Sequence, residues 1–475
     1  MNLTNFLLMR QEISLIAIFF ILFVYDLFAS DKAKKYFQPF ACVLFALHTL
    51  YGFCPNIPVG SAFAGMYVTG NMHILVKNIL NIGVLLTFLQ SSSWLKNPDT
   101  IVRRGEFFMI TVFTLFGMYL MISAGHFLMF YIGLETASIP MAALIAFNKY
   151  KNDSAEAGVK YILTACFSSG IMLFGISMLY GATGALYFSD IAPMLISGNM
   201  MMILGMVFFL AGMFFKLSLV PFHLWAADVY QGAPTPVTAY LSVVSKGAAA
   251  FVLTILMFKV FSNMVTEWRE IFKWIIVITI TVGNLFAIRQ NNLKRFLAFS
   301  SISQAGYIVL GILPGTGLGM TTVVYYILAY LFSNFAAFGV IASIEAKSGK
   351  VNISDYNGLY QTHPKLSLIM MLSLFSLGGI PFFVGFFSKF FIFLAAVKAG
   401  FYVIVFLALL NTIVSLYYYL LIVKAMFINK NESPVPAFNS DGYSRLSLII
   451  CVAGILLVGI VSPIFHYIER LGFGM

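Results

Sequence analysis

The sequence predicts an all-α polytopic membrane protein with about fourteen transmembrane helices, arranged as two inverted five-helix repeats that each contain a broken helix. The prediction rests on composition, on fourteen long apolar segments, and on an uneven distribution of positive charge between alternate loops. The chain is 61% hydrophobic and 9% charged, with a mean hydropathy of +0.94. A soluble domain carries about 25% charged residues. The connections are short, which excludes a nucleotide-binding or iron–sulfur module on this chain.

Each apolar segment is long enough for a helix across a bilayer, which needs about 20 residues for roughly 30 Å of hydrocarbon. We expect the first segment to remain in the membrane and not to act as a cleaved signal, because its lysines follow the apolar run. The expected spans are 12–29, 37–54, 71–91, 107–123, 125–147, 156–180, 199–219, 236–261, 271–288, 298–313, 318–345, 366–396, 400–428 and 444–468.

Positive charge separates by side when the loops are assigned to alternate faces of the membrane. One face receives sixteen Lys and Arg residues, the other receives five, and the remaining seven of the 28 fall within spans. The positive-inside rule then places the first face in the cytoplasm and both termini outside. For a bacterial chain this means the inner membrane, with both termini on the periplasmic side.

The net charge of +11 is therefore a signal of topology, and we expect no nucleic-acid partner. The four cysteines are far apart and lack the C-x-x-C spacing of a metal or cluster site. The sequence predicts no metal and no cofactor on this chain.

Two apolar segments contain a proline that is expected to break the helix. Pro221 follows Lys216 by five residues, whereas Pro381, preceded by Gly379, comes eight residues before Lys389. Proline removes a backbone donor and clashes with the preceding turn. In a membrane, the freed carbonyls find partners only inside protein or beside water. Interrupted helices at corresponding places in two halves indicate an inverted-repeat transporter.

The positions of the breaks divide the chain. Each proline lies in the fourth of five helices, counted from 107 in one half and from 271 in the other, and the halves start on opposite faces. We expect an N-terminal three-helix segment (1–106), a first repeat (107–261), a second inverted repeat (262–428) and a C-terminal helix (429–475).

Four ionisable residues lie inside or at the break of an apolar segment: Glu135, Lys216, Lys246 and Lys389. A lysine at bilayer depth costs roughly 2.5–3.5 kcal/mol on insertion scales. Burial disfavours the charged form of either group, and a nearby opposite charge favours it. We expect Glu135 to pair with Lys216, so that separation of the two releases a proton. A row of such sites forms a proton relay.

Other polar residues have two interpretations each. Lys160 is one turn inside the sixth span and either joins the relay or extends to the cytoplasmic surface. His223 either bridges the regions of Lys216 and Lys246 or caps the broken helix. Ser303, Gln304 and Tyr307 are candidates to hold water in the second half.

The residues around the first break resemble the N-type antiporter-like subunits of proton-pumping NADH–quinone oxidoreductase (respiratory complex I), within the Mrp antiporter-like family. The most specific stretch is 215–240, FKLSLVPFHLWAADVYQGAPTPVTAY, whose DVYQGAP portion is unlike the sister subunits L and M. Residues 292–303 (NLKRFLAFSSIS) and 417–420 (YYYL) are also similar. One departure is FFVG at 382–385, where the family usually has a second proline and small residues.

The resemblance implies a proton-translocating subunit in which Glu135, Lys216, Lys246, Lys389 and Lys160 carry protons between two half-channels. It implies that NADH, FMN, iron–sulfur clusters and quinone are bound by partner subunits, whose quinone reduction drives the pump. The implied neighbours are the antiporter-like subunit M, the small subunits K, J and A, and lipid. Which half-channel opens to which face stays open.

Two other functions fit the same fold class. A subunit of a Mrp-type sodium/proton antiporter would carry the same lysines, although the motif at 228–234 argues against it. An independent transporter of a small solute would show unpaired polar or aromatic groups at the midplane. The midplane groups here are mainly Glu and Lys, which suits protons better.

Overall fold

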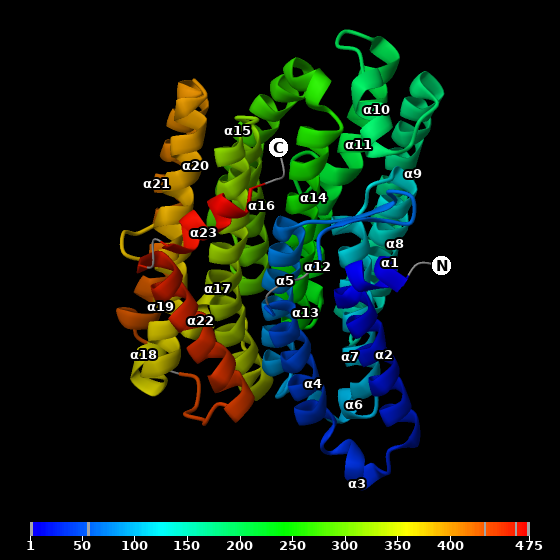
Figure 1. The fold of residues 1–475 in the computed structure, drawn as a ribbon. Helices are drawn as coiled ribbons and strands as arrows, with labels where there is room; N and C mark the ends of the chain where they lie inside the picture. Colours follow the sequence, from blue (N-terminus) through cyan, green and yellow to red (C-terminus); the bar gives the residue numbers. More distant parts are fainter. Residues whose placement is uncertain (1–2, 55–57, 432–433, 461–462, 473–475) are drawn as a thin grey trace.

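The computed structural model describes residues 3–54, 58–431, 434–460 and 463–472 (Figure 1). Its helices are α1 (Leu3–Leu8), α2 (Arg10–Phe28), α3 (Asp31–Lys34), α4 (Phe37–Gly52), α5 (Asn71–Gln90), α6 (Pro98–Ile101), α7 (Arg104–Ile122), α8 (Phe127–Ile145), α9 (Asn152–Thr183), α10 (Phe188–Met194), α11 (Met200–Leu217), α12 (Leu224–Gly232), α13 (Thr235–Tyr240), α14 (Lys246–Lys259), α15 (Val265–Ile288), α16 (Leu293–Ile312), α17 (Gly317–Ser348), α18 (Leu359–Thr362), α19 (Pro364–Gly378), α20 (Val384–Lys398), α21 (Tyr402–Phe427), α22 (Gly442–Ile460) and α23 (Pro463–Leu471).

The predicted apolar segments correspond to these helices. Within the described residues, twelve helices are long and apolar enough to span a membrane, and α4 and α19 are two shorter apolar helices. Together they account for the fourteen predicted spans. The predicted span 366–396 is two helices, α19 and α20, as the proline requires. The span 236–261 is α13 and α14 joined by a π-helical turn at Leu241–Ser245, which the sequence did not indicate.

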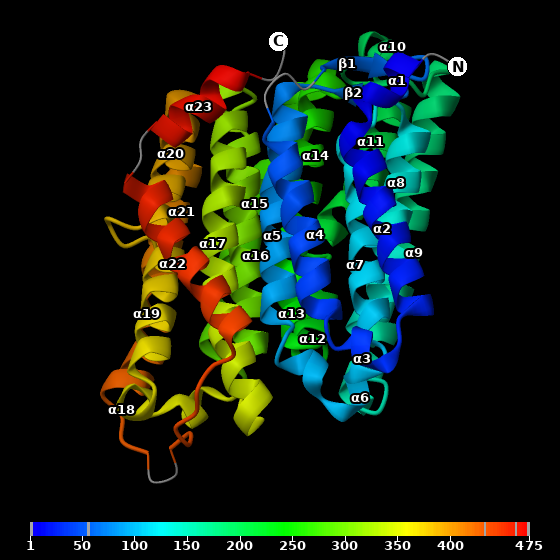
Figure 2. The ribbon, with the colours of Figure 1, turned by 60° about the horizontal axis from the view of Figure 1, so that its bottom comes forward.

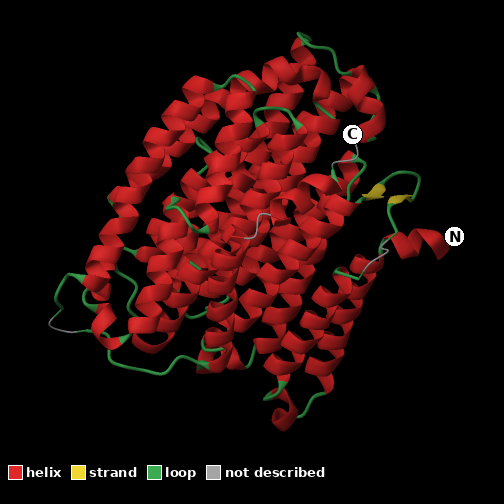
Figure 3. Cartoon of the chain, turned by 60° about the vertical axis from the view of Figure 1, so that its left-hand side comes forward, coloured by secondary structure: helices red, strands yellow, loops and turns green. Residues whose placement is uncertain are grey.

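One further span and one additional element differ from the prediction. The span 444–468 is described as α22 and a short helix, α23, and residues 461 and 462 lie outside the described residues. The chain also contains an antiparallel hairpin of β1 (Gly60–Ala62) and β2 (Tyr67–Thr69), an exception to the all-α prediction (Figure 3). The hairpin lies with α1 at the end of the bundle where α2 begins (Figure 2).

Helix ends are set by local capping. The Asn292 side chain accepts hydrogen bonds from the first backbone N–H groups of α16, and Thr316 does the same for α17. Such caps satisfy donors that have no partner within the helix. At the other end, α9 stops at Gly184, whose φ of 67° is the left-handed conformation that closes many helices.

The most buried helices lie in the middle of the bundle (Figures 1 and 2). In α16 and in α17, 94% of the most apolar stretch is buried inside the protein, compared with 28% in α2 and 33% in α21. The outer helices therefore present their apolar side chains outward, as expected for a protein surrounded by lipid. Lys246 and Lys389, on helices that pack against α16 and α17, are buried.

Candidate functional site

The first broken helix ends at Ser218, in the left-handed conformation with φ of 57°, two residues after Lys216. The chain then passes through Pro221 and restarts as α12. Backbone groups freed by the break have partners within the protein. Trp225 Nε1 donates to the carbonyl of Phe215 at 3.2 Å, and Val220 N donates to Thr279 Oγ1 on α15 at 3.1 Å. The break is therefore stable at membrane depth.

Lys216 does not form the predicted ion pair with Glu135. No salt bridge joins them within the described residues; Lys216 Nζ donates instead to Ser138 Oγ, and lies 3.4 Å from Tyr161 Oη. Ser138 is three residues beyond Glu135 on α8, so it occupies the same helix face. The Glu135 Oε1 atom is buried and has no hydrogen-bond partner among the described residues. The prediction of a direct ion pair was wrong for this conformation, because the Lys216 ammonium group donates a hydrogen bond to the Ser138 hydroxyl instead.

Lys246 is almost fully enclosed, with 3% of its surface exposed. It begins α14 directly after the π-helical turn, and its Nζ donates to Ser301 Oγ on α16 at 2.8 Å. The ammonium also lies 5.4 Å from the ring centroid of Tyr230 on α12. A buried lysine with one hydroxyl partner and one aromatic face can lose its proton and regain it without breaking an ion pair.

Lys389 on α20 lies at the second break, with 4% of its surface exposed. Its Nζ donates to the carbonyls of Leu377 at 2.9 Å and Gly378 at 3.2 Å, the last residues of α19. These carbonyls have lost their helical partners, and the C-terminus of a helix attracts positive charge. Gly379 closes α19 with φ of 88°, and Pro381 follows it. The lysine therefore both carries charge and stabilises the end of the broken helix.

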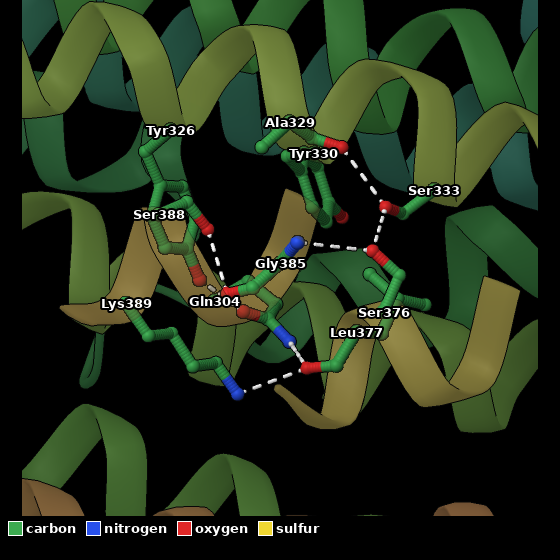
Figure 4. Close-up of a pocket in the computed structure, with 10 residues that line it drawn as sticks. All are labelled: Gln304, Tyr326, Ala329, Tyr330, Ser333, Ser376, Leu377, Gly385, Ser388 and Lys389. Carbon is green, nitrogen blue, oxygen red and sulfur yellow. Dashed lines mark hydrogen bonds between the residues drawn. The ribbon is translucent and has the colours of Figure 1, made fainter. Parts of the chain in front are cut away.

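A small polar pocket of about 10 Å³ lies beside Lys389 (Figure 4). That volume is close to the least that holds one water molecule. Gln304 Nε2 on α16 donates to the same Leu377 carbonyl that accepts from Lys389, at 3.2 Å, and Gln304 Oε1 accepts from the Tyr326 hydroxyl. On the other side of the pocket, the hydroxyls of Ser333 and Ser376 are 2.8 Å apart.

One face of α16 connects the central lysine with the terminal one. Ser301 accepts from Lys246, Gln304 shares a carbonyl with Lys389, and the Tyr307 ring centroid lies 5.0 Å from Lys389 Nζ. Successive members of this series are three residues apart, which is about 4.5 Å along a helix. The polar residues 301, 304 and 307 thus form a ladder between the two lysines. Ser303, predicted with them, is not on it: its hydroxyl is buried without a partner in the described residues.

Aromatic side chains fill the space between the first lysine and the central one. The Tyr161 ring lies 5.4 Å from that of Trp225, which in turn lies 6.4 Å from Tyr230 below Lys246. His223 occupies the position before α12, but its side chain makes no capping hydrogen bond, and its Nδ1 is buried without a partner among the described residues. Among the described residues His223 therefore does not cap α12, although it interacts with the backbone of Pro221 at the break.

Lys160 lies at the surface, with 42% of its side chain exposed. It forms ion pairs of 2.7 Å with Glu156 and with Asp228, and Asp228 also pairs with Arg295 at 2.6 Å. These groups line an open cavity of about 210 Å³. The position of Lys160 fits the interpretation that it extends to the surface, because an exposed lysine with two ion-pair partners is not a desolvated proton carrier.

One buried charge pair was not predicted from the sequence. Glu12 on α2 and Lys77 on α5 form an ion pair of 2.5 Å, and both side chains are 0% exposed. The available signal was weak: Lys77 lies within a predicted span and Glu12 at the edge of another, but the two residues are 65 positions apart.

Comparisons with known proteins fit this geometry. Residues 124–415 match the family model described as NADH:quinone oxidoreductase/Mrp antiporter, TM. The chain belongs to the NADH:quinone oxidoreductase/Mrp antiporter family. The matched region contains both breaks and the residues Glu135, Lys216, Lys246 and Lys389.

Relatives of this antiporter-family chain cover its full length. It is 56% identical over 470 residues to "NADH-quinone oxidoreductase subunit N" of Phocaeicola vulgatus, covering 99% of each chain. It is 55% identical to the subunit N of Azobacteroides pseudotrichonymphae, covering 100% of this chain and 99% of the relative.

Solved structures share the fold. A chain of respiratory complex I from Thermus thermophilus superimposes with a TM-score of 0.82 and 27% identity, over 97% of this chain and 100% of that chain. A chain of the Mrp complex from Dietzia superimposes with a TM-score of 0.87 over 99% of this chain and 97% of that one. Its 18% identity indicates a common fold alone.

Proposed function

We propose that this chain is the proton-translocating, antiporter-like membrane subunit of an NADH–quinone oxidoreductase. The observation that carries the proposal is the polar ladder on α16, which links the enclosed Lys246 to Lys389 through Ser301, Gln304 and Tyr307. The ladder lies on α16, which with α17 is one of the two most buried helices among the described residues. Lysines in such a place are costly, and moving charge is the function that explains them.

The proposed relay runs from Glu135 and Lys216 to Lys246, and then along α16 to Lys389. Redox chemistry on partner subunits changes the relation between Glu135 and Lys216. When the carboxylate approaches the lysine, the ammonium form is favoured more strongly. In this structure the hydrogen-bond partners of the lysine, Ser138 and Tyr161, are neutral, and Glu135 acts on it only from a longer distance. A proton on Lys216 is then easier to release toward Lys246. Glu135 would be the switch of this step, and Ser138 the group that holds the separated state.

The proposed division of the chain is that of two inverted repeats, 107–261 and 262–428, between an N-terminal segment (1–106) and a C-terminal one (429–475). Similar packing in the two halves supports it. The helices α7 and α8 cross at Gly117, where a Cβ would lie 2.4 Å from the backbone of Ala137. The helices α15 and α16 cross at Gly283, where a Cβ would lie 2.8 Å from the backbone of Ser303.

The proposal includes partners. NADH, FMN, iron–sulfur clusters and quinone would be bound by other subunits, since the connections of this chain are too short to form a soluble redox module. The neighbours in the membrane would be subunit M, the small subunits K, J and A, and lipid. For a chain so similar to bacterial relatives, the expected location is the inner membrane, with both termini on the outer side.

The test is to replace the central lysine in the assembled complex, reconstituted in vesicles, and to measure NADH oxidation separately from proton pumping. Lys246→Met and Lys216→Met are expected to abolish or strongly reduce pumping. Thr254→Val is a matched control on α14, because the Thr254 hydroxyl is buried and bonds only within its own helix, to the carbonyl of Ala250. Full pumping in both lysine variants would contradict the relay. Sodium flux that depends on the same lysines would favour the Mrp-type antiporter.

A further inference from the structure

The relay described above does not use the N-terminal segment, yet the most deeply buried ion pair in the described residues lies there. Glu12 is in the first turn of α2, and Lys77 is in the second turn of α5, beneath the β1–β2 hairpin. Lys77 Nζ lies 2.5 Å from Glu12 Oε1 and 3.3 Å from the Tyr67 hydroxyl, while Tyr67 donates to Glu12 Oε2 at 3.0 Å. Each of the two carboxylate oxygens therefore lies within hydrogen-bond distance of a donor, and the Leu8 carbonyl at 3.2 Å is a second acceptor for the single hydrogen of the Tyr67 hydroxyl.

Lys77 has neutral partners besides Glu12. Its ammonium lies 5.3 Å from the ring centroids of both Tyr67 on the hairpin and Tyr119 on α7. These rings and the Tyr67 hydroxyl would continue to stabilise the cation if the carboxylate were protonated. The pair can therefore gain one proton on Glu12 without leaving a buried cation alone.

Tyr119 also belongs to a hydrogen-bonded chain of four side chains. Ser14 Oγ is 2.8 Å from His48 Nδ1, His48 Nε2 is 3.3 Å from the Tyr119 hydroxyl, and that hydroxyl donates to Asn81 Oδ1 at 2.5 Å. The chain crosses four helices, α2, α4, α7 and α5. Asn81 is four residues after Lys77, so it returns to the face of α5 that carries the ion pair.

The donors of this chain allow two arrangements of protons on His48. In one, Ser14 donates to His48 Nδ1 and the Nε2–H group donates to Tyr119, with a neutral imidazole. In the other, Ser14 donates to the carbonyl of Gln11, which lies 3.0 Å away, and both ring nitrogens donate, which requires a charged imidazolium. The two states differ by one proton and by the rotation of one hydroxyl group.

A purely structural role explains this arrangement poorly. Burying two charges costs several kcal/mol for each ion, and well-packed apolar residues in place of a buried pair are often neutral or stabilising. Helices α2 and α5 are already held together by neutral contacts, such as the hydrogen bond of 2.9 Å from Gln11 Nε2 to Asn78 Oδ1. A charged pair, two tyrosines and a histidine in one buried cluster are titratable groups of the kind that gather at functional sites.

We propose that Glu12, Lys77 and His48 form a further proton-holding site of the pump, in the N-terminal segment. In the loading step, a proton binds the Glu12 carboxylate to give the neutral acid, while Lys77 stays an ammonium ion between the Tyr67 and Tyr119 rings. In the release step, the carboxyl group gives up the same proton and the ion pair forms again. His48 supplies or accepts the proton, and Tyr119 lies between the two groups: its hydroxyl is 3.3 Å from His48 Nε2 and its ring faces Lys77 Nζ. The proposal rests on the proposed function, because it needs a proton-pumping complex.

The titratable groups around this site come from several helices and the hairpin. Tyr67 and Tyr119 face the pair directly, and His73 is one turn before Lys77 on α5. Lys259 at the end of α14 is close enough to His73 to act on it electrostatically. None of these supplies a second carboxylate to the pair, so Glu12 is the group whose protonation the experiment follows.

The experiment uses the complete complex in vesicles, with the double variant Glu12→Gln/Lys77→Met and the single variant His48→Gln. The double variant removes both charges together and leaves no unpaired ion, so assembly is expected to be preserved. Both variants are expected to lose protons pumped per NADH oxidised, at an unchanged rate of NADH oxidation in uncoupled vesicles. The pH profile of pumping is also expected to lose a titration step, which a structural role would not alter.

Thr49→Val is the control, since Thr49 is next to His48, is buried, and bonds only to the Phe45 carbonyl of its own helix. Assembled variants that pump fully with the profile of the unmodified complex would overturn the proposal. If the double variant does not assemble, His48→Gln decides the question alone. Loss of pumping in Lys246→Met together with full pumping in these variants would reject only this site, whereas full pumping in Lys246→Met would reject the relay itself.

Discussion

Replacing Gly379 by alanine separates backbone strain from displacement of the terminal lysine. Gly379 has φ of 88°, and a residue with a side chain in the left-handed region costs roughly 1–2 kcal/mol. A Cβ at this position would also lie 3.2 Å from Cδ of Lys389. The lysine chain would have to move away from the end of α19, where its Nζ donates to two carbonyls. Hydrogen bonds to a charged group contribute about 1.5–3 kcal/mol each, so the shift is costly.

Gly184→Ala provides a matched control. Gly184 also ends a helix in the left-handed conformation, with φ of 67°, but none of the described residues comes within 4 Å of a Cβ placed there. Both variants are expected to lower the thermal stability of the assembled complex through backbone strain, and Gly379→Ala is expected to lower it further because Lys389 is displaced. Only Gly379→Ala is expected to reduce protons pumped per NADH as well, measured in vesicles. Equal pumping by the two variants would show that the position of Lys389 at the end of α19 is unimportant.

Three further outcomes follow from the geometry. Gln304→Leu removes the middle of the ladder on α16 and is expected to reduce pumping while NADH oxidation in uncoupled vesicles continues; unchanged pumping would place the route elsewhere. Lys160→Met is expected to leave pumping and assembly unchanged, because Lys160 is exposed and doubly paired; loss of pumping would return it to the relay. Burial raises the pKa of the Asp441 carboxyl, but the hydrogen bond and charge of Lys96 at 2.8 Å outweigh this and hold the pKa below its usual range. The stabilisation by the Asp441 carboxylate is therefore complete above the usual carboxyl pKa and is lost as the pH falls through the lowered pKa. Asp441→Asn should lower the free energy of unfolding by at most about 1 kcal/mol at neutral pH and not at all in strong acid. Thermal unfolding at several pH values would test this.

Much of the fold was predictable because membrane insertion is governed by local sequence. Apolar segments of sufficient length must become helices, since every backbone donor and acceptor in lipid needs an internal partner. The same constraint explains why Pro221 and Pro381 could be interpreted as breaks. Their detailed geometry was not predictable. The bond from Lys389 to the end of α19 depends on how α20 folds back against that helix.

The pairing of charges was less predictable than their presence. The sequence predicted that Glu135 and Lys216 face the interior of one bundle. Whether an ammonium group contacts a carboxylate or a nearby hydroxyl depends on differences of a few Å, and in this structure Lys216 contacts Ser138. The pair of Glu12 and Lys77 was missed for a related reason. Neither residue lies near a break or in a motif, and only the tertiary arrangement of α2, α4, α5 and the hairpin brings them together.

By itself, the sequence determined that this protein is a helical membrane protein with about fourteen spans, which segments are interrupted, and that lysines occur at membrane depth. These properties follow from hydropathy and proline, which act over a few residues. The tertiary structure alone decided which groups those lysines contact: Ser138 for Lys216, Ser301 for Lys246, the end of α19 for Lys389 and Glu12 for Lys77. Hydrogen bonds need their atoms within about 3 Å, and only the packing of helices distant in sequence sets positions to that accuracy.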